Sequence, residues 1–210
     1  MFTLIKREIQ DHIAYFLGAI LFSAVIIAIS ISLIYHYDSG DPPVFRIALS
    51  FPVIIVVIIG FCTMGATQMY TDRTRKISTL LSTLAVTRSR ILLARIITGI
   101  LAILTLLVPL TITAVVLLRL FTPPIPMYPG LVSEIFIATF LMAFACYCLG
   151  LLTGWNSSKI IPTLGGLVLT CILVPLVLVK GFGLHIVVIL LLFIIASLVR
   201  TWHTFMSTSL

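Results

Sequence analysis

The sequence predicts an all-α, polytopic membrane protein with six transmembrane helices. Its 210 residues are 61% hydrophobic and only 9% charged, and its mean hydropathy is +1.29. Soluble domains have an apolar share of about one half and a charged share of roughly a quarter. Six apolar stretches meet or approach the roughly 20 residues that a helix needs to cross a bilayer. The chain is therefore expected to form one transmembrane domain over residues 1–210.

The first expected element is an amphipathic helix over residues 1–14. Its apolar positions recur at spacings of three and four, at Phe2, Ile5, Ile9 and Ile13. Polar and charged side chains fill the stretch from Lys6 to His12 between them. One apolar stripe beside a charged face is typical of a helix that lies in the membrane interface.

Six transmembrane helices are expected after this surface helix. They are placed at residues 15–35, 47–70, 89–120, 131–153, 160–179 and 184–198. The last of these is short for a full crossing. Prolines inside the spans predict kinks because each removes a backbone hydrogen bond, and they are Pro52, Pro109, Pro162 and Pro175. Such kinks are either fixed bends against neighbouring helices or moving hinges.

Positive charges predict the orientation of the spans. Of the thirteen Lys and Arg residues, ten fall on one side of the six-span arrangement and three, Arg46, Arg119 and Lys180, fall on the other. Cytoplasmic loops carry the excess of Lys and Arg, so both termini are expected in the cytoplasm. No nucleic-acid partner is expected from the net charge of +7, because such a partner needs a basic face exposed to water.

Ionisable groups inside the spans are few, which argues against a membrane enzyme. Glu134 and His185 lie near the outer ends of the fourth and sixth spans and are expected at the membrane interface. The GxSG motif of rhomboid proteases and the Walker GxxxxGK[ST] loop are both absent from the sequence. Cys146 and Cys148 are two residues apart and so point to different faces of a helix. No catalytic residue, metal site or cofactor is therefore expected in this chain.

A basic segment between the second and third spans is the most distinctive part of the sequence. The stretch from Tyr70 to Arg95 holds six of the thirteen basic residues. Its charged residues come first, at Asp72, Arg73, Arg75 and Lys76, and apolar residues follow at Ile77, Leu80, Leu81 and Leu84. This pattern predicts a short amphipathic helix in a cytoplasmic loop over residues 71–88. The loop either fixes topology and contacts anionic lipid or docks a partner protein.

The arrangement resembles the permease subunits of type-2 ATP-binding-cassette (ABC) transporters. In that family an amphipathic elbow helix precedes the first span, and the loop after the second span has an acidic residue with Arg, then Thr-Leu, then Val-Ser-Arg and a basic residue on the next span. This chain has Asp72-Arg73, Thr79-Leu80, Val86-Thr87-Arg88 and Arg95 in these places. Lys76-Ile77 stands where an acidic residue and Gly are common, and Ala85 replaces the usual Pro. The compact length is also similar to the haem exporter protein B branch.

The resemblance implies a permease, most simply an exporter, in a bacterial or archaeal cytoplasmic membrane. Such a permease pairs with a second copy of itself or with a homologous permease, and with two copies of a cytoplasmic ATPase that holds ATP and magnesium. The chain itself is then not an enzyme. Residues 1–14 correspond to the elbow helix, and Ile77–Leu84 to the coupling helix that docks on the ATPase. Asp72, Arg73, Arg75, Lys76 and Arg88 are its charged neighbours.

The scarcity of charge in the spans favours a hydrophobic or amphiphilic substrate, such as a lipid, a hydrophobic peptide, a drug-like amphiphile or haem. Polar candidates for its path are Thr63, Thr67, Gln68, Thr111 and Thr113. The same residues can instead hold helices together by hydrogen bonds. Two other functional classes stay open: an intramembrane enzyme of rhomboid or lipid-modifying type, and a membrane assembly or scaffold subunit.

Overall fold

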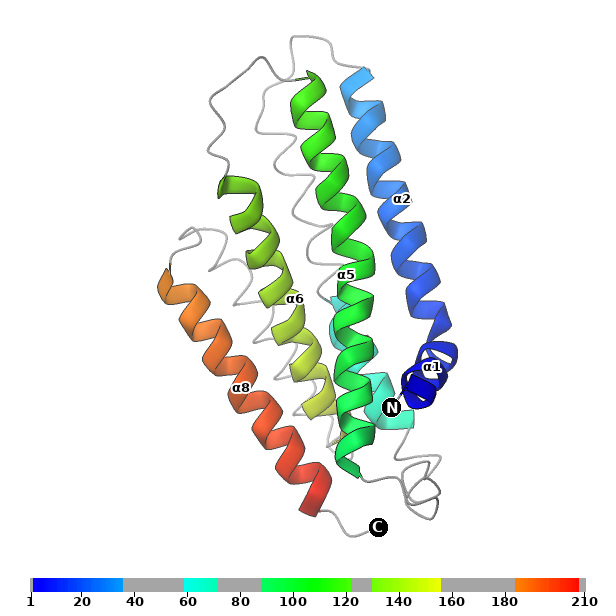
Figure 1. Ribbon diagram of the computed structural model, residues 1–210, viewed down its shortest axis with the longest axis vertical. Coiled ribbons are helices and arrows are strands. Elements are labelled where there is room, and N and C mark those ends of the chain that lie inside the picture. Colours follow the sequence, from blue (N-terminus) through cyan, green and yellow to red (C-terminus); the bar gives the residue numbers. More distant parts are fainter. Residues whose placement is uncertain (1, 36–58, 72–87, 122–129, 156–183, 208–210) are drawn as a thin grey trace.

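The computed structural model describes residues 2–35, 59–71, 88–121, 130–155 and 184–207, and every element in this part of the chain is a helix. The helices are α1 (Phe2–Asp11), α2 (Ile13–Tyr35), a helix over residues 59–71, α5 (Arg88–Phe121), α6 (Gly130–Trp155) and α8 (Leu184–Ser207). Figure 1 shows the four long helices running side by side, with α1 set across one end of the bundle.

Three of the described helices are long and apolar enough to cross a membrane. Their qualifying segments are Ser89–Thr113 in α5, Phe136–Gly154 in α6 and His185–Ser207 in α8. A fourth crossing is counted if α1 and α2, which are bent by 64° at their junction, are taken as one broken span. The structure therefore supports the predicted helical transmembrane character. The fifth predicted span, residues 160–179, lies outside the described residues, and the second is described only from residue 59.

The apolar runs predict the ends of α2, α5 and α6 to within two residues. α5 is helical from end to end through Pro109, whereas the other three span prolines lie outside the described residues. The predicted end of the last helix at Leu198 was wrong, since α8 continues to Ser207. The prediction ended the helix before the charged Arg200. In the structure Arg200 and His203 are exposed, while Thr201 and Phe205 on the other side of the helix are buried. The helix thus continues with one face against the bundle.

The surface helix ends earlier than predicted, at Asp11 rather than residue 14. The backbone turns at His12, whose N–H donates to the carbonyl of Glu8 at 3.1 Å and whose carbonyl accepts from the N–H of Tyr15 at 3.0 Å. These two bonds close the last turn of α1 and the first turn of α2, so the 64° bend occurs at a single residue. Ile13, expected on the surface helix, is the first residue of α2 and is 53% exposed.

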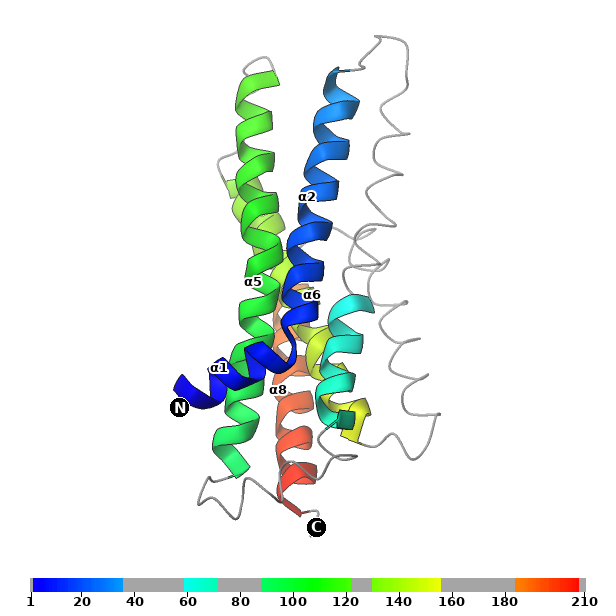
Figure 2. The same cartoon turned by 90° about the vertical axis from the view of Figure 1, so that its right-hand side faces the viewer.

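α5 is the central helix of the described bundle, because it contacts α1, α2, α6 and α8. Its buried positions include Ile103 and Leu106, which join Tyr147 and Leu151 of α6 and Leu190 of α8 in one apolar cluster. Figure 2 shows α1 crossing the first turns of α5, at the end where α8 and the helix of residues 59–71 terminate. The chain therefore leaves residue 71 and re-enters α5 at Arg88 on the same end that carries α1.

The helix of residues 59–71 approaches α6 closely through small residues. A methyl group on Gly150 would overlap the carbonyl oxygen of Cys62, and one on Gly154 would overlap that of Ala66. A methyl group on Gly65 would lie 2.5 Å from the carbonyl oxygen of Tyr147. Glycine is required at these positions because the two backbones are in contact, as in other small-residue helix pairs within membranes.

Candidate functional site

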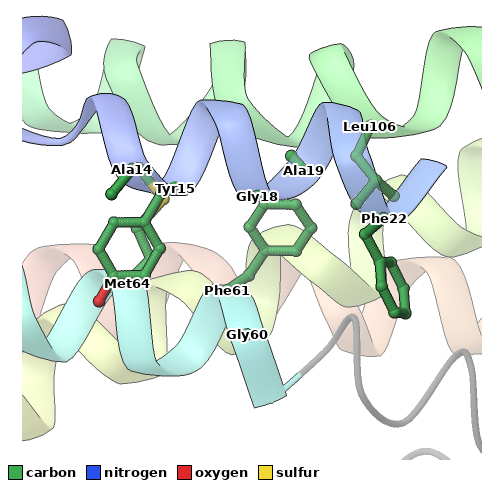
Figure 3. A pocket seen from close by; sticks show the side chains of 9 residues that line it. All are labelled: Ala14, Tyr15, Gly18, Ala19, Phe22, Gly60, Phe61, Met64 and Leu106. Carbon is green, nitrogen blue, oxygen red and sulfur yellow. The ribbon is translucent and has the colours of Figure 1, made fainter. Parts of the chain in front are cut away.

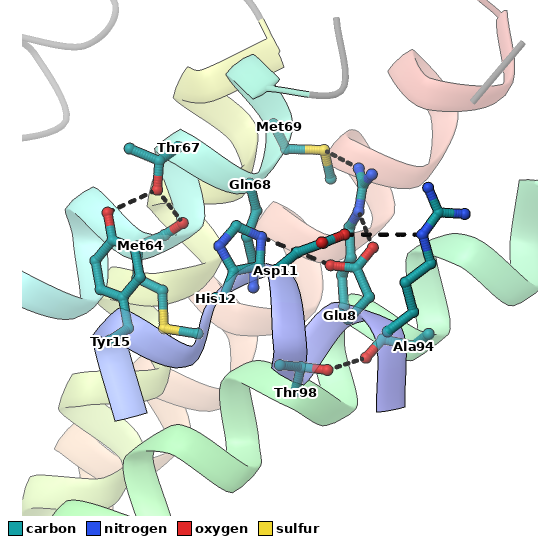
Figure 4. Close-up of polar contacts among 12 residues, drawn as sticks. Glu8, Asp11, His12, Tyr15, Met64, Thr67, Gln68, Met69, Ala94 and Thr98 are labelled. Atoms are coloured by element: carbon teal, nitrogen blue, oxygen red, sulfur yellow. Dashed lines mark hydrogen bonds and ion pairs between the residues drawn. The ribbon is translucent and has the colours of Figure 1, made fainter. Parts of the chain in front are cut away.

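Polar side chains converge where α1 meets the bundle (Figure 4). Nε of Arg95 on α5 lies 3.4 Å from Oε1 of Glu8 on α1, and the two side chains are only 3% and 17% exposed. Nη1 of Arg95 also donates to Sδ of Met69, in the helix of residues 59–71, at 3.3 Å. One guanidinium therefore links three helices.

The burial of Arg95 makes this link strongly dependent on its partners. A guanidinium removed from water is stable only when its charge is paired and its N–H groups are hydrogen-bonded. The nearest turns of α5 are apolar, with Ile91 and Leu92 buried beside it. Glu8 consequently supplies a counter-charge from α1, the element that the sequence predicts to lie in the membrane interface. The junction couples the position of α1 to the start of α5.

Tyr147 extends the polar contacts from α5 to α6. Its ring is fully buried, and its hydroxyl lies 2.6 Å from Oε1 of Gln68 and 2.8 Å from the carbonyl oxygen of Arg95. A phenol has one proton to donate, so donation to the carbonyl and acceptance from the amide of a flipped Gln68 side chain satisfies both contacts. The ring fits against α5 only because residue 99 is glycine, as a methyl group there would overlap it.

His12 lies at the bend between α1 and α2 and beside the ion pair. Its Nε2 is 3.7 Å from Oε2 of Glu8. Burial lowers the pKa of His12 below its ordinary value, and the charge of Arg95 lowers it further, while Glu8 and Asp11 act in the opposite direction. The lowered pKa favours the neutral form of His12 near neutral pH. The charged partner of Glu8 is then Arg95.

A second contact joins α2 to the helix of residues 59–71. Oγ1 of Thr67 donates to the carbonyl of Met64 at 2.9 Å, so the hydroxyl of Tyr15, also at 2.9 Å, is the donor to Thr67. Both ends of this contact are partly buried. Together with the Tyr147 and Arg95 contacts, it connects all described helices except α8 at one end of the bundle.

The candidate path residues divide into two groups. Thr67 and Gln68 make the interhelical contacts described above, on the buried side of their helix. Thr63 donates to the carbonyl of Gly60 at 2.8 Å, Thr113 donates to that of Pro109 at 2.8 Å, and Thr111 bonds to the carbonyl of Leu107. These three bonds stay within one helix. A substrate path through the five residues stays a prediction.

Of the predicted docking residues, the structure describes only Arg88. Asp72, Arg73, Arg75, Lys76, Ile77, Leu80, Leu81 and Leu84 lie outside the described residues, and Arg88 is the first residue of α5. On the surface helix, Phe2 is the first residue of α1, and Ile5 and Ile9 are half-buried. Of the four predicted apolar positions, Ile5 and Ile9 are therefore partly covered on α1, whereas Ile13 belongs to α2 and is exposed.

Glu134 and His185 are exposed near the starts of α6 and α8, and their place at the membrane interface stays a prediction. The three cysteines within the described ranges form no disulfide bond: Cys146 and Cys148 are buried, and Cys62 is half-buried. Among the residues that the structure describes, no three His, Cys, Asp or Glu side chains are grouped as they would be around a metal ion.

Sequence reasoning missed three features of this junction. Glu8 was counted only as part of a polar face, and Tyr147 only as one apolar residue among many. The Gly150-Leu-Leu-Thr-Gly154 run is a GxxxG motif, the recognised sequence signal for close helix approach in membranes, and it identifies α6 as the partner of a small-residue helix.

A scan against protein-family models, a search of curated proteins and a search of solved structures each found no match.

Proposed function

We propose that this chain is the transmembrane permease subunit of an ABC-type exporter, working with a separate ATPase. The observation that carries the proposal is the Glu8–Arg95 ion pair. It joins an amphipathic surface helix to the first turns of the helix that follows the basic loop of residues 72–87. A force applied to that loop would be transmitted to α1 and α5 as one unit.

The distribution of described charges supports a cytoplasmic position for this end of the bundle. Lys6 and Arg7 lie on α1, Arg88, Arg90 and Arg95 in the first turns of α5, and Arg200 in the last turns of α8. Among described Lys and Arg residues only Arg119 belongs to the opposite end of its helix. An excess of Lys and Arg marks the cytoplasmic side, so both termini and the loop face the compartment that holds ATP.

The proposed mechanism is mechanical coupling by a rigid junction. The apolar side of the Ile77–Leu84 helix seats in a groove of the ATPase, a helix-in-groove contact, and the neighbouring basic residues steer the association. Closure of two ATPase subunits around ATP and magnesium then moves the helices on either side of the loop. Because Arg95, Met69 and Tyr147 connect these helices at the same end, the movement reaches α6.

The test replaces Leu80 and Leu81 by Asp and measures which proteins co-purify with the chain in mild detergent from its native host. Recovery of a Walker-motif ATPase with the unchanged chain, and its loss from the variant, is the expected result. Thr79→Asp with Ser82→Asp is the matched control, because these positions lie on the opposite side of the predicted helix and add the same charge. ATPase recovery that survives the leucine changes would contradict the docking role. Recovery of the chain alone in every case would favour an enzyme or a scaffold.

A further inference from the structure

A cavity of about 240 Å³ lies between α2 and the helix of residues 59–71 (Figure 3). Its buried floor is apolar and includes Phe61, Met64 and Leu106. Its wall on α2 runs from Ala14 to Phe22, a length of about 12 Å at 1.5 Å per residue. The cavity therefore begins next to the α1–α2 bend and extends into the half of the bundle nearer α1.

Two glycines on opposite walls create this space. Outside its own helix backbone and chain neighbours, no described atom lies within 4 Å of a methyl group placed on Gly18 or on Gly60. Both therefore differ from Gly65, Gly99 and Gly150, where a methyl group would overlap a neighbour. A glycine in a helix interior is disfavoured by about 1 kcal/mol relative to alanine, and at Gly18, inside α2, close packing with described residues gives no compensation. What the two glycines provide is volume.

Water is a poor occupant for this cavity. The polar group on its wall is the hydroxyl of Tyr15, which is already bonded to Thr67 at 2.9 Å. A buried water needs two to four polar partners, and apolar cavities stay dry. An empty space of this size would forfeit the dispersion contacts of its lining. The chemistry of the walls thus favours hydrocarbon.

The cavity is open on its outer side. Ala14, Gly18 and Gly60 at its rim are exposed, and on the adjoining surface of α2 the side chains of Leu17 and Leu21 are 59% and 68% exposed. In a membrane-spanning bundle an apolar helix surface of this kind contacts lipid hydrocarbon or another apolar helix, and not water. Access to the cavity is consequently lateral, from the hydrocarbon, and not from water.

We propose that this cavity binds an acyl-chain segment of a membrane lipid from the leaflet on which α1 lies. An apolar cavity of about 150 Å³ already accepts a benzene-sized ligand, so the larger volume here admits several methylene groups. The lining begins at Ala14, two residues after the bend at His12, so with α1 in the interface, as its sequence predicts, the cavity lies just below it, at the depth of the upper part of a lipid chain. The site does not depend on the proposed transport function.

Photo-crosslinking tests the proposal with the full chain in phosphatidylcholine vesicles. A small fraction of the lipid carries a diazirine in the upper part of one acyl chain, and labelled residues are located by mass spectrometry after irradiation. Enriched labelling of Phe61 and Met64 over the lipid-facing residues Leu17 and Leu21 is the expected result. Labelling confined to Leu17 and Leu21 would overturn the proposal, because it shows contact with bulk lipid only.

Filling the cavity from either wall provides the second arm. Gly18→Leu and Gly60→Leu should reduce labelling of Phe61 and Met64 to background, whereas Ala24→Leu, an exposed position of α2 that does not line the cavity, should leave it unchanged. Gly18→Ala, which adds one methyl group without a clash, serves as the variant least able to disturb folding and should give a partial loss. Labelling that persists in both leucine variants would also overturn the proposal.

Discussion

Removal of the Glu8–Arg95 ion pair is expected to detach α1 from the bundle without unfolding the long helices. α1 has ten residues, fewer than the roughly 12–15 that an isolated helix needs for even marginal stability. Its contacts within the described structure are with α5 and, to a smaller extent, α2. Its order therefore depends on docking, and the buried ion pair is the charged part of that contact.

The size of the effect follows from the separation and burial of the charges. At 3.4 Å and an effective dielectric constant of about 20, the gross attraction is about 5 kcal/mol. Desolvation of Arg95 and the remaining exposure of Glu8 offset much of this, and contacting charged residues show net couplings of about 0.5–3 kcal/mol. A coupling of about 2 kcal/mol corresponds to a roughly 30-fold change in the docking equilibrium.

Hydrogen exchange of the α1 amides measures this equilibrium, since local opening controls the exchange of docked segments. Four chains in lipid nanodiscs are compared: the unchanged protein, Glu8→Met, Arg95→Met and the double variant. Each single change should raise α1 exchange by about one to two decades, and the double variant should exchange far more slowly than the product of the two effects. Exchange rates in α6 should stay the same.

Additive effects would refute the reasoning. If the effect of the double variant equals the sum of the two single effects to within about 0.3–0.5 kcal/mol, the two residues act independently. The ion pair then does not hold α1 on the bundle. Arg7→Gln is the matched control on the same helix. Arg7 lies 3.8 Å from Asp11, but both side chains are about half exposed, so its loss should cost about 0.5 kcal/mol or less.

Three further predictions concern pH, helix contact and the buried phenol. Burial lowers the pKa of His12 below 6.5 in the folded protein, so the folded state binds fewer protons than the unfolded state. Thermal stability should therefore fall as the pH decreases from about 7 to 5.5. The fall should be smaller in the His12→Gln variant, which lacks the titrating group. Gly150→Ala should lower the stability by about 1–3 kcal/mol through overpacking, whereas Gly60→Ala should raise it by up to about 1 kcal/mol, both measured by thermal unfolding in detergent. Tyr147→Phe leaves buried polar atoms without their partner and should cost about 1–3 kcal/mol in the same assay.

Helix positions were largely predictable because a bilayer imposes a length and a polarity on each span. The apolar runs at residues 15–35, 89–120 and 131–153 match α2, α5 and α6 closely. The rule failed at the end of α8, where the helix continues beyond the apolar run as an amphipathic segment. It failed again at residues 11–14, where the apolar periodicity continues past the bend at His12 and so gives no sign of it.

The contacts between helices were far less predictable than the helices themselves. Apolar residues facing lipid and apolar residues facing the bundle have the same composition, so periodicity does not identify the buried face: Leu21 is 68% exposed and Leu92 is 1% exposed. Glu8 and Arg95 are 87 positions apart in the sequence, and nothing local to either residue indicates their pairing. The GxxxG spacing at Gly150, which sequence reasoning missed, marks α6 for close approach by another helix but does not name that helix.

Glycine shows why one sequence signal supports opposite structural readings. Between helices in a membrane there is no hydrophobic driving force, so close packing and hydrogen bonds hold the bundle together. Gly99, Gly150 and Gly154 serve that purpose, because a side chain on any of them would separate the helices or displace the Tyr147 ring. Gly18 and Gly60 also lie on helices, but a methyl group placed on either would meet no described atom of a neighbouring element within 4 Å. The three-dimensional neighbours of a glycine, and not its spacing, therefore decide whether it brings helices together or keeps a cavity open between them.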